Sequence, residues 1–130
     1  MRKRTSEKIS INLKTKNPTI PILINVDLFE WVIENIIKNS IDAISQKGEI
    51  MIEVSEKERL VIIDVIDNGR GIKKSFFNEI FKPGVTSKKR GWGLGLSLVK
   101  RIIKDYHKGE VKIQKSIPNT ETVLRIVLNK

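Results

Sequence analysis

The chain has 130 residues, 39% hydrophobic and 31% charged, which predicts one globular domain with its own core. The absence of cysteine excludes disulfides, thiolate metal sites and a cysteine nucleophile, and no apolar run approaches the roughly 18 residues of a membrane span, so we expect a cytoplasmic chain. The formal net charge of +10 suggests a polyanionic partner such as nucleic acid, anionic lipid or a nucleotide.

The first half of the chain begins with a polar, basic segment, residues 1–8, which we interpret as a linker remnant before a domain at residues 9–130. Alternating apolar and polar residues predict strands at 9–13 and 22–26. A helix is predicted from Asp27, as an N-cap paired with Glu30, to about residue 45, ended by Lys47-Gly48.

The second half mixes strands and helices without strict alternation. Strands are predicted at 49–55, 60–66, 110–115 and 122–128, a short helix at 76–81, a long amphipathic helix at 93–106, and polar loops at 67–71 and 83–91. This order favours an α+β fold, a two-layer sandwich in which a mixed, mostly antiparallel sheet of about five strands packs on about three helices.

Two asparagines, Asn35 and Asn39, lie four residues apart in the first predicted helix and therefore share one face. Asparagine is costly to bury without partners, and its amide oxygen is a hard ligand of the kind that Mg²⁺ prefers. The alternative is a pair of exposed polar residues. A broader apolar face is expected to pack on the sheet, formed by Phe29, Ile33, Ile36, Ile37, Ser40 and Ile44.

Two glycine-rich segments follow. Asp67-Asn-Gly-Arg-Gly71-Ile72 comes directly after a buried strand, so its carboxylate is placed to accept a hydrogen bond from an amine and its glycines to approach a flat ligand. Gly91-Trp-Gly-Leu-Gly-Leu96 leads into a helix and offers N–H groups to an anion, beside Lys88, Lys89 and Arg90. Either segment alone also fits an ordinary turn.

Taken in order, these segments resemble the motifs of the sensor histidine kinases. Asn35-Ile-Ile-Lys-Asn39 resembles the N box, Asp67-Asn-Gly-Arg-Gly71 the first glycine box, and Gly91-Trp-Gly-Leu-Gly-Leu96 the second. Ile80-Phe-Lys-Pro83 with Thr86-Ser-Lys88 resembles the F box and the start of the ATP lid. The resemblance, over residues 9–130, implies the catalytic ATP-binding domain of such a kinase, in the superfamily of gyrase B and the chaperone and mismatch-repair ATPases.

The resemblance also implies roles for single residues. Asn39, assisted by Asn35, would coordinate Mg²⁺ on the phosphates of ATP, and Asp67 would accept the adenine amino hydrogen. Thr122 falls where the family has a threonine near an adenine-bound water. The base would lie by Gly69, Gly71 and Ile72; the phosphates would meet N–H groups of Gly91, Gly93, Leu94, Gly95 and Leu96, and the cations Lys88, Arg90 and Lys38.

A kinase of this type also needs an acceptor histidine. The only one here, His107, is expected to be structural, so we expect the acceptor on a helical dimerisation segment of a homodimeric parent protein, with a response regulator downstream and this domain itself monomeric. By this resemblance, Asn35 occupies the position where gyrase-type ATPases have a Glu that activates water. Glu34 lies on another face of the helix, and both points favour phosphoryl transfer over hydrolysis. Two alternatives remain at this stage: a related serine kinase or ATPase, and a basic module that binds nucleic acid or an anionic membrane.

Overall fold

The computed structural model describes residues 9–17, 19–20, 22–44, 47–83 and 95–130, and the structural statements below refer to these residues. Five strands form one mixed sheet in the order β1-β2-β3-β5-β4. Only the β1–β2 pair is parallel, and the other three pairs are antiparallel. The strands are β1 (Ile9–Thr15), β2 (Gly48–Lys57), β3 (Leu60–Asp67), β4 (Glu110–Ile117) and β5 (Glu121–Asn129).

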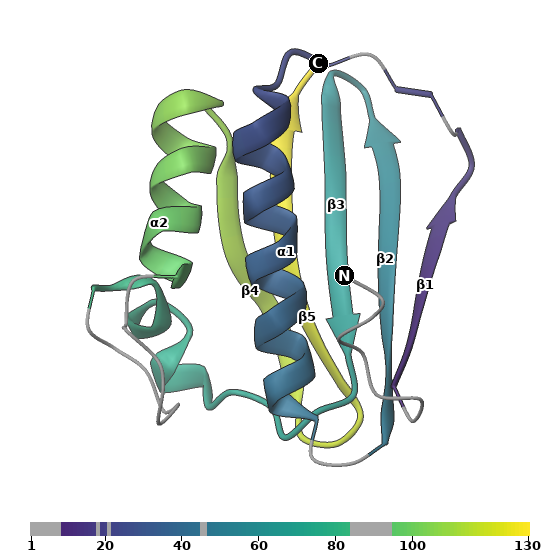
Figure 1. The fold of residues 1–130 in the computed structure, drawn as a ribbon, viewed down its shortest axis with the longest axis vertical. Helices are drawn as coiled ribbons and strands as arrows, with labels where there is room; N and C mark the ends of the chain where they lie inside the picture. The colour runs from purple at the N-terminus through teal and green to yellow at the C-terminus, as the bar shows by residue number, and fades with distance from the viewer. Residues whose placement is uncertain (1–8, 18, 21, 45–46, 84–94) are drawn as a thin grey trace.

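The helices cover one face of this sheet (Figure 1). The central one, α1 (Val26–Ala43), has Asn25 as its N-cap, whose side chain accepts a hydrogen bond from Leu28 N. Two 3₁₀ turns, Lys74–Phe76 and Glu79–Phe81, precede α2 (Gly95–Arg101), which continues as one π-helical segment, Ile102–Tyr106. Among the described residues no helix has both the length and the apolarity needed to cross a bilayer.

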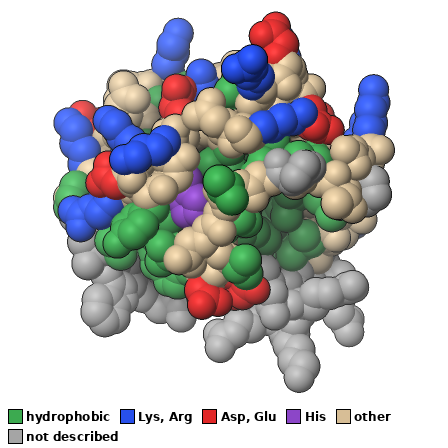
Figure 2. All heavy atoms as spheres, turned by 90° about the horizontal axis from the view of Figure 1, so that it is seen from above, with side chains coloured by type: hydrophobic (Ala, Val, Ile, Leu, Met, Phe, Trp, Pro, Cys, Tyr) green, Lys and Arg blue, Asp and Glu red, His purple; other side chains and the backbone are tan. Residues whose placement is uncertain are grey.

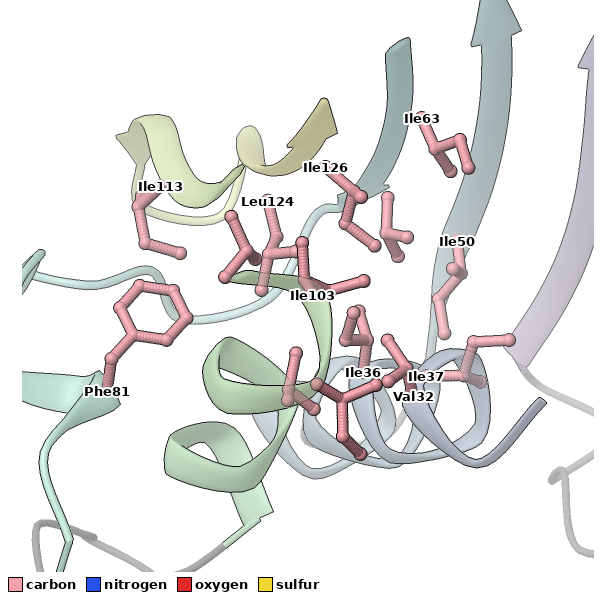
Figure 3. Packing of buried hydrophobic residues seen from close by; sticks show 14 of the residues in the cluster. Val32, Ile36, Ile37, Ile50, Ile63, Phe81, Ile103, Ile113, Leu124 and Ile126 are labelled. Atoms are coloured by element: carbon pink, nitrogen blue, oxygen red, sulfur yellow. The ribbon is translucent and has the colours of Figure 1, made fainter. Parts of the chain in front are cut away.

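The core lies between the two layers. Val32, Ile36 and Ile37 of α1 are buried, and they point toward the buried side chains of the sheet together with Ile103, which follows α2 (Figure 3). The sheet contributes alternate residues, as expected for strands covered on one face, because successive side chains point to opposite sides. Its buried residues at this interface are Ile50, Val61, Ile63, Val65, Val111, Ile113, Leu124, Ile126 and Leu128. The two-layer α+β fold predicted from the sequence is therefore confirmed.

Four local predictions are wrong. Residues 22–25 form no strand, and Leu23 is 96% exposed there; the place beside β2 is taken by β1. The cap of α1 is Asn25 and not Asp27, so the helix starts earlier than expected. It also ends earlier, at Ala43, and Gly48 begins β2. The short helix expected at 76–81 is replaced by two separate 3₁₀ turns.

His107 connects the start of α1 with the segment Ile102–Tyr106 through hydrogen bonds. Its Nε2 accepts a hydrogen bond from Asn25 N at 3.0 Å, and its Nδ1 lies 3.0 Å from Ile102 O. Since a carbonyl only accepts, Nδ1 donates to Ile102 O, while Nε2 accepts from Asn25 N. The ring also packs edge-on against Phe29. Figure 2 shows the molecule from the end where α1 begins, and there hydrophobic side chains lie at the surface beside Lys and Arg side chains. These contacts support the structural role predicted for His107.

Replacing this histidine tests that role. His107→Phe keeps an aromatic ring against Phe29 and removes both hydrogen bonds, so we expect the free energy of unfolding to fall by about 1 kcal/mol. Chemical denaturation of the nucleotide-free chain measures this loss. The neighbouring Tyr106, 68% exposed, provides the control: Tyr106→Ala should change the midpoint little. A His107→Phe variant as stable as the original chain would contradict the assignment.

Candidate functional site

The two asparagines of α1 lie half-buried on the side of the helix that faces the start of α2. Asn35 Nδ2 donates to Trp31 O at 2.9 Å, and Asn39 Nδ2 donates to Asn35 O at 3.0 Å. Because each amide nitrogen is bound to the helix backbone, the orientation of each amide is fixed, and its oxygen lies on the other side of the group. This donor set fits a hard cation such as Mg²⁺.

Gly95, the first residue of α2, lies next to this face. A β-carbon added at Gly95 would lie 3.5 Å from Asn35 Oδ1, an ordinary contact distance. The structure therefore brings Asn35 beside the end of the second glycine segment, whose Leu96 packs against the core. Lys38 is on α1 but exposed. Five of the predicted residues lie outside the described residues: Lys88, Arg90, Gly91, Gly93 and Leu94.

Asp67, the last residue of β3, is only 7% exposed. Its Oδ1 accepts a hydrogen bond from Gly69 N at 2.9 Å. Burial raises the pKa of this carboxyl above its ordinary value, while the hydrogen bonds from Gly69 N and the Ser40 side chain and the charge of Arg70 act in the opposite direction. A buried carboxylate with few partners of its own is suited to accept a hydrogen bond from a ligand.

The loop after Asp67 is held on two sides. Arg70 N donates to Ala43 O at the end of α1, and Asn119 N in the β4–β5 turn donates to Gly69 O, at 2.9 and 2.8 Å. A β-carbon at Gly69 would meet Ala43 O at 2.6 Å, so a side chain there cannot fit without a backbone shift. Gly71 has φ +84, in the left-handed region that favours glycine. The predicted need for glycine at these two positions is thereby explained.

Three polar side chains form a row across the sheet beside this loop. Asp67 of β3 is directly opposite Thr122 of β5, and Thr122 is opposite Ser116 of β4. The hydroxyl oxygens of Ser116 and Thr122 are 2.7 Å apart, and Ile72 N donates to Ser116 Oγ at 2.8 Å. The structure therefore brings Asp67, Gly71, Ile72 and Thr122 together, as their predicted common role requires.

Sequence reasoning missed two residues of this region, Ser40 and Ser116. Ser40 was assigned to the apolar face of α1, where it is buried, but its hydroxyl also binds Asp67. A serine among isoleucines on a helix is a signal of a polar partner, because a buried hydroxyl is costly unless bonded. For Ser116 the signal is weaker, because a β-bulge between Ile113 and Lys115 changes which residues of β4 face inward.

Comparison with known proteins identifies the family that the sequence motifs resemble. Residues 24–130 match the family model described as histidine kinase-, DNA gyrase B-, and HSP90-like ATPase. Sporulation kinase D of Bacillus subtilis is 33% identical over 110 residues, which are 85% of this chain and 21% of that protein. The signal transduction histidine-protein kinase AtoS of Escherichia coli is 36% identical over 115 residues, 86% of this chain and 18% of that protein. The chain thus spans about a fifth of the length of these curated relatives.

Solved structures agree with this match. The nucleotide-free catalytic domain of the histidine kinase ThkA superimposes with a TM-score of 0.85 and 28% identity, over 95% of this chain and 80% of that one. The similarity covers both layers of the fold and not only the glycine segments.

Proposed function

Since the chain belongs to the family of histidine kinase-, DNA gyrase B- and HSP90-like ATPases, we propose that it is the catalytic domain of a sensor histidine kinase, which binds Mg·ATP and phosphorylates a histidine of its parent protein. One observation carries the proposal most directly. The buried carboxylate of Asp67 and the glycine loop that follows it are bonded to Ser40 and Ala43 of α1, the helix that carries the oriented amides of Asn35 and Asn39, and this juxtaposition supports a nucleotide site.

Each part of this site has a separate task. Asp67 accepts a hydrogen bond from the adenine amino group, while Gly69 and Gly71 let the backbone approach the flat base. The amide oxygens of Asn35 and Asn39 would hold Mg²⁺, which would supply positive charge beside the phosphates. Lys88 and Arg90 add positive charge to the phosphate side. Catalysis then depends on positioning and on stabilisation of charge, because phosphoryl transfer needs little covalent chemistry from the protein.

Transfer to a histidine fits this site better than hydrolysis. Activation of water needs a general base near the γ-phosphate, and the position facing the start of α2 is held by the amide of Asn35. Glu34 is exposed, on the face that carries Lys38. An imidazole nitrogen of the acceptor forms a bond to the γ-phosphorus, and the bond from that phosphorus to the β–γ bridging oxygen breaks as ADP leaves.

A groove beside α2 supports the presence of a partner segment. Phe81, Pro83 and Leu98 supply apolar surface to a hollow of about 440 Å³, and the remaining lining residues are Ser97, Lys100, Arg101, Lys104 and Asp105. Three cations around an apolar floor complement an amphipathic helix with acidic residues. We place the helical dimerisation segment of the parent protein there, and a response regulator receives the phosphoryl group from that segment.

A labelling experiment tests the proposed reaction. We expect the 130-residue chain to bind ATP and not to label itself with the γ-phosphoryl group, because the single histidine, His107, has both ring nitrogens bound to backbone groups. Adding the dimerisation segment of the parent protein should give an acid-labile phosphohistidine on that segment. Radiolabelled ATP is supplied to each component alone and to the mixture.

Two results would contradict this function. Label on the isolated chain, or rapid release of phosphate without a partner, would favour the serine kinase or ATPase alternative. Glu34→Gln is the matched control for hydrolysis: since Glu34 is exposed and outside the proposed site, the slow release of phosphate should not change.

A further inference from the structure

The hydroxyl of Ser116 has no role in the function proposed above, and yet it connects two parts of the base site. Its Oγ accepts a hydrogen bond from Ile72 N and lies 2.7 Å from Thr122 Oγ1. It also stands against Gly71, where an added β-carbon would meet it at 3.0 Å. Ser116 thus touches the glycine loop on one side and the residue opposite Asp67 on the other.

Ser116 points to the inner face of the sheet because β4 contains a β-bulge between Ile113 and Lys115. Val111 and Ile113 of β4 are buried, so strict alternation would point Lys115 to the same face. The bulge between Ile113 and Lys115 shifts the register by one residue, so that Lys115 pairs with Val123 and Ser116 pairs with Thr122. A bulge that exchanges a lysine for a serine at a ligand site redirects a side chain in the way that bulges beside active sites do.

Either hydroxyl of the Ser116–Thr122 pair can be the donor, and each direction leaves a different hydrogen for other partners. Ser116 Oγ already accepts from Ile72 N, and a hydroxyl has a single hydrogen to donate. If Ser116 donates that hydrogen to Thr122 Oγ1, the hydrogen of Thr122 is left for another acceptor. The hydrogen bonds that act on Asp67 come from Gly69 and Ser40, so the Thr122 hydroxyl remains available to a ligand beside that carboxylate.

We propose that Ser116 is a positioning residue for base recognition: it donates to Thr122 and thereby directs the Thr122 hydroxyl toward N1 of the bound adenine, directly or through one water. Adenine presents an amino donor beside the N1 acceptor, and Asp67 with Thr122 presents the complementary acceptor and donor on adjacent strands. Opposite side chains on antiparallel strands are about 5 Å apart, a separation that one base edge can span. This inference rests on the proposed function, since it assumes that adenine binds at Asp67.

The test compares ATP with 1-deaza-ATP, in which N1 is replaced by a C–H group and the amino group is kept. We expect Ser116→Ala to lower the affinity for ATP about five- to tenfold and to change the affinity for 1-deaza-ATP less than about twofold, because the contact is already missing from that ligand. Ser116→Thr keeps the hydroxyl and should restore ATP affinity. If Ser116 only stabilises the β4–β5 hairpin, Ser116→Ala should lower the affinities for ATP and for 1-deaza-ATP by the same factor.

Calorimetric titration of the full chain supplies these affinities, and thermal melting confirms that each variant is folded. Thr120→Ala is the matched control, since this hydroxyl belongs to the same hairpin and bonds only locally to Pro118 O. If Ser116→Ala does not fold, the near-isosteric Ser116→Cys, with its weak donor, takes its place and should show the same selective loss.

The possible failures separate the two proposals. A chain that binds no ATP overturns the proposed function. Two results overturn only the inference about Ser116. In the first, Ser116 substitution lowers the affinities for ATP and for 1-deaza-ATP by the same factor. In the second, the original chain binds ATP and 1-deaza-ATP with the same affinity.

Discussion

Asp67→Asn should lower the affinity for ATP about 100-fold, because it replaces a charged acceptor with an amide whose nitrogen opposes the adenine amino group. The original chain should prefer ATP to GTP by about 1,000-fold, since guanine presents a carbonyl oxygen to a buried carboxylate. An amide donates to that oxygen, so the preference should narrow sharply in the variant. Calorimetry with both nucleotides measures the change.

The control for this substitution is Asp27→Asn, on the exposed first turn of α1, which should leave both affinities unchanged. Thermal melting checks that Asp67→Asn is folded. Comparable affinities of the original chain for ATP and GTP would refute the role of Asp67 in base recognition.

The pH dependence of binding gives a second measurement of the same residue. Burial raises the pKa of Asp67, and the ionised carboxylate accepts the amino hydrogen more strongly than the neutral carboxyl does. ATP affinity should therefore fall as the pH drops through this raised pKa, at a higher pH than an exposed aspartate would give. The bound amino group favours the ionised form, so binding releases protons in that range, and Asp67→Asn should abolish the release.

The pH dependence of folding stability has the opposite sign to that of ATP affinity. A carboxyl whose pKa is higher in the folded than in the unfolded chain binds its proton more tightly when folded. The nucleotide-free domain should therefore become more stable as the pH falls through the folded-state pKa of Asp67, to the extent that this residue contributes. Denaturation midpoints of the original chain and of Asp67→Asn, compared across that range, isolate the contribution.

The layers of the fold could be predicted because their signals are repeated along each element. Alternation over β3 and β5 and the apolar face of α1 each involve several residues, so a single irregularity does not obscure them. Residues 22–26 show the same alternation, but the strand predicted there is wrong. Alternation indicates which face a strand would bury, and it does not show that a neighbouring strand is present to pair with it. β1 takes the place beside β2, and residues 22–25 pair with none of the five strands.

The site was predictable in part for a related reason. Asp67, Asn35 and Asn39 are found in local motifs, so a nucleotide site at these residues could be proposed from the sequence. Ser116 depends instead on the bulge in β4, and a one-residue change of register leaves almost no trace in composition. Ser40 depends on the packing of α1 over the end of β3, a contact between segments far apart in the sequence.

Asn39→Ala should affect nucleotide binding only when the metal is present. The side chain supplies an amide oxygen to Mg²⁺ in the proposed site, so its removal should weaken Mg·ATP binding about 10- to 100-fold and metal-free ATP binding less than about threefold. The fold should tolerate the change, because alanine is the stronger helix former and Asn39 is only half-buried. Titrations in Mg²⁺ and in a chelator, with Glu34→Ala on the exposed face of the same helix as control, give the two values.

A second substitution at this position, Asn39→Asp, should make ATP binding depend more strongly on Mg²⁺. Asn39→Asp offers the metal a carboxylate, which is a hard oxygen ligand, and at the same time places a negative charge beside the phosphates. Binding of Mg·ATP should therefore survive in this variant, while metal-free ATP binds much more weakly than to the original chain. Alanine and aspartate thus move the Mg²⁺ dependence in opposite directions, the first reducing it and the second increasing it. A role of Asn39 confined to its hydrogen bond with Asn35 O, at 3.0 Å, predicts instead that both variants lose affinity equally with and without metal, and that outcome would remove Asn39 from the metal site.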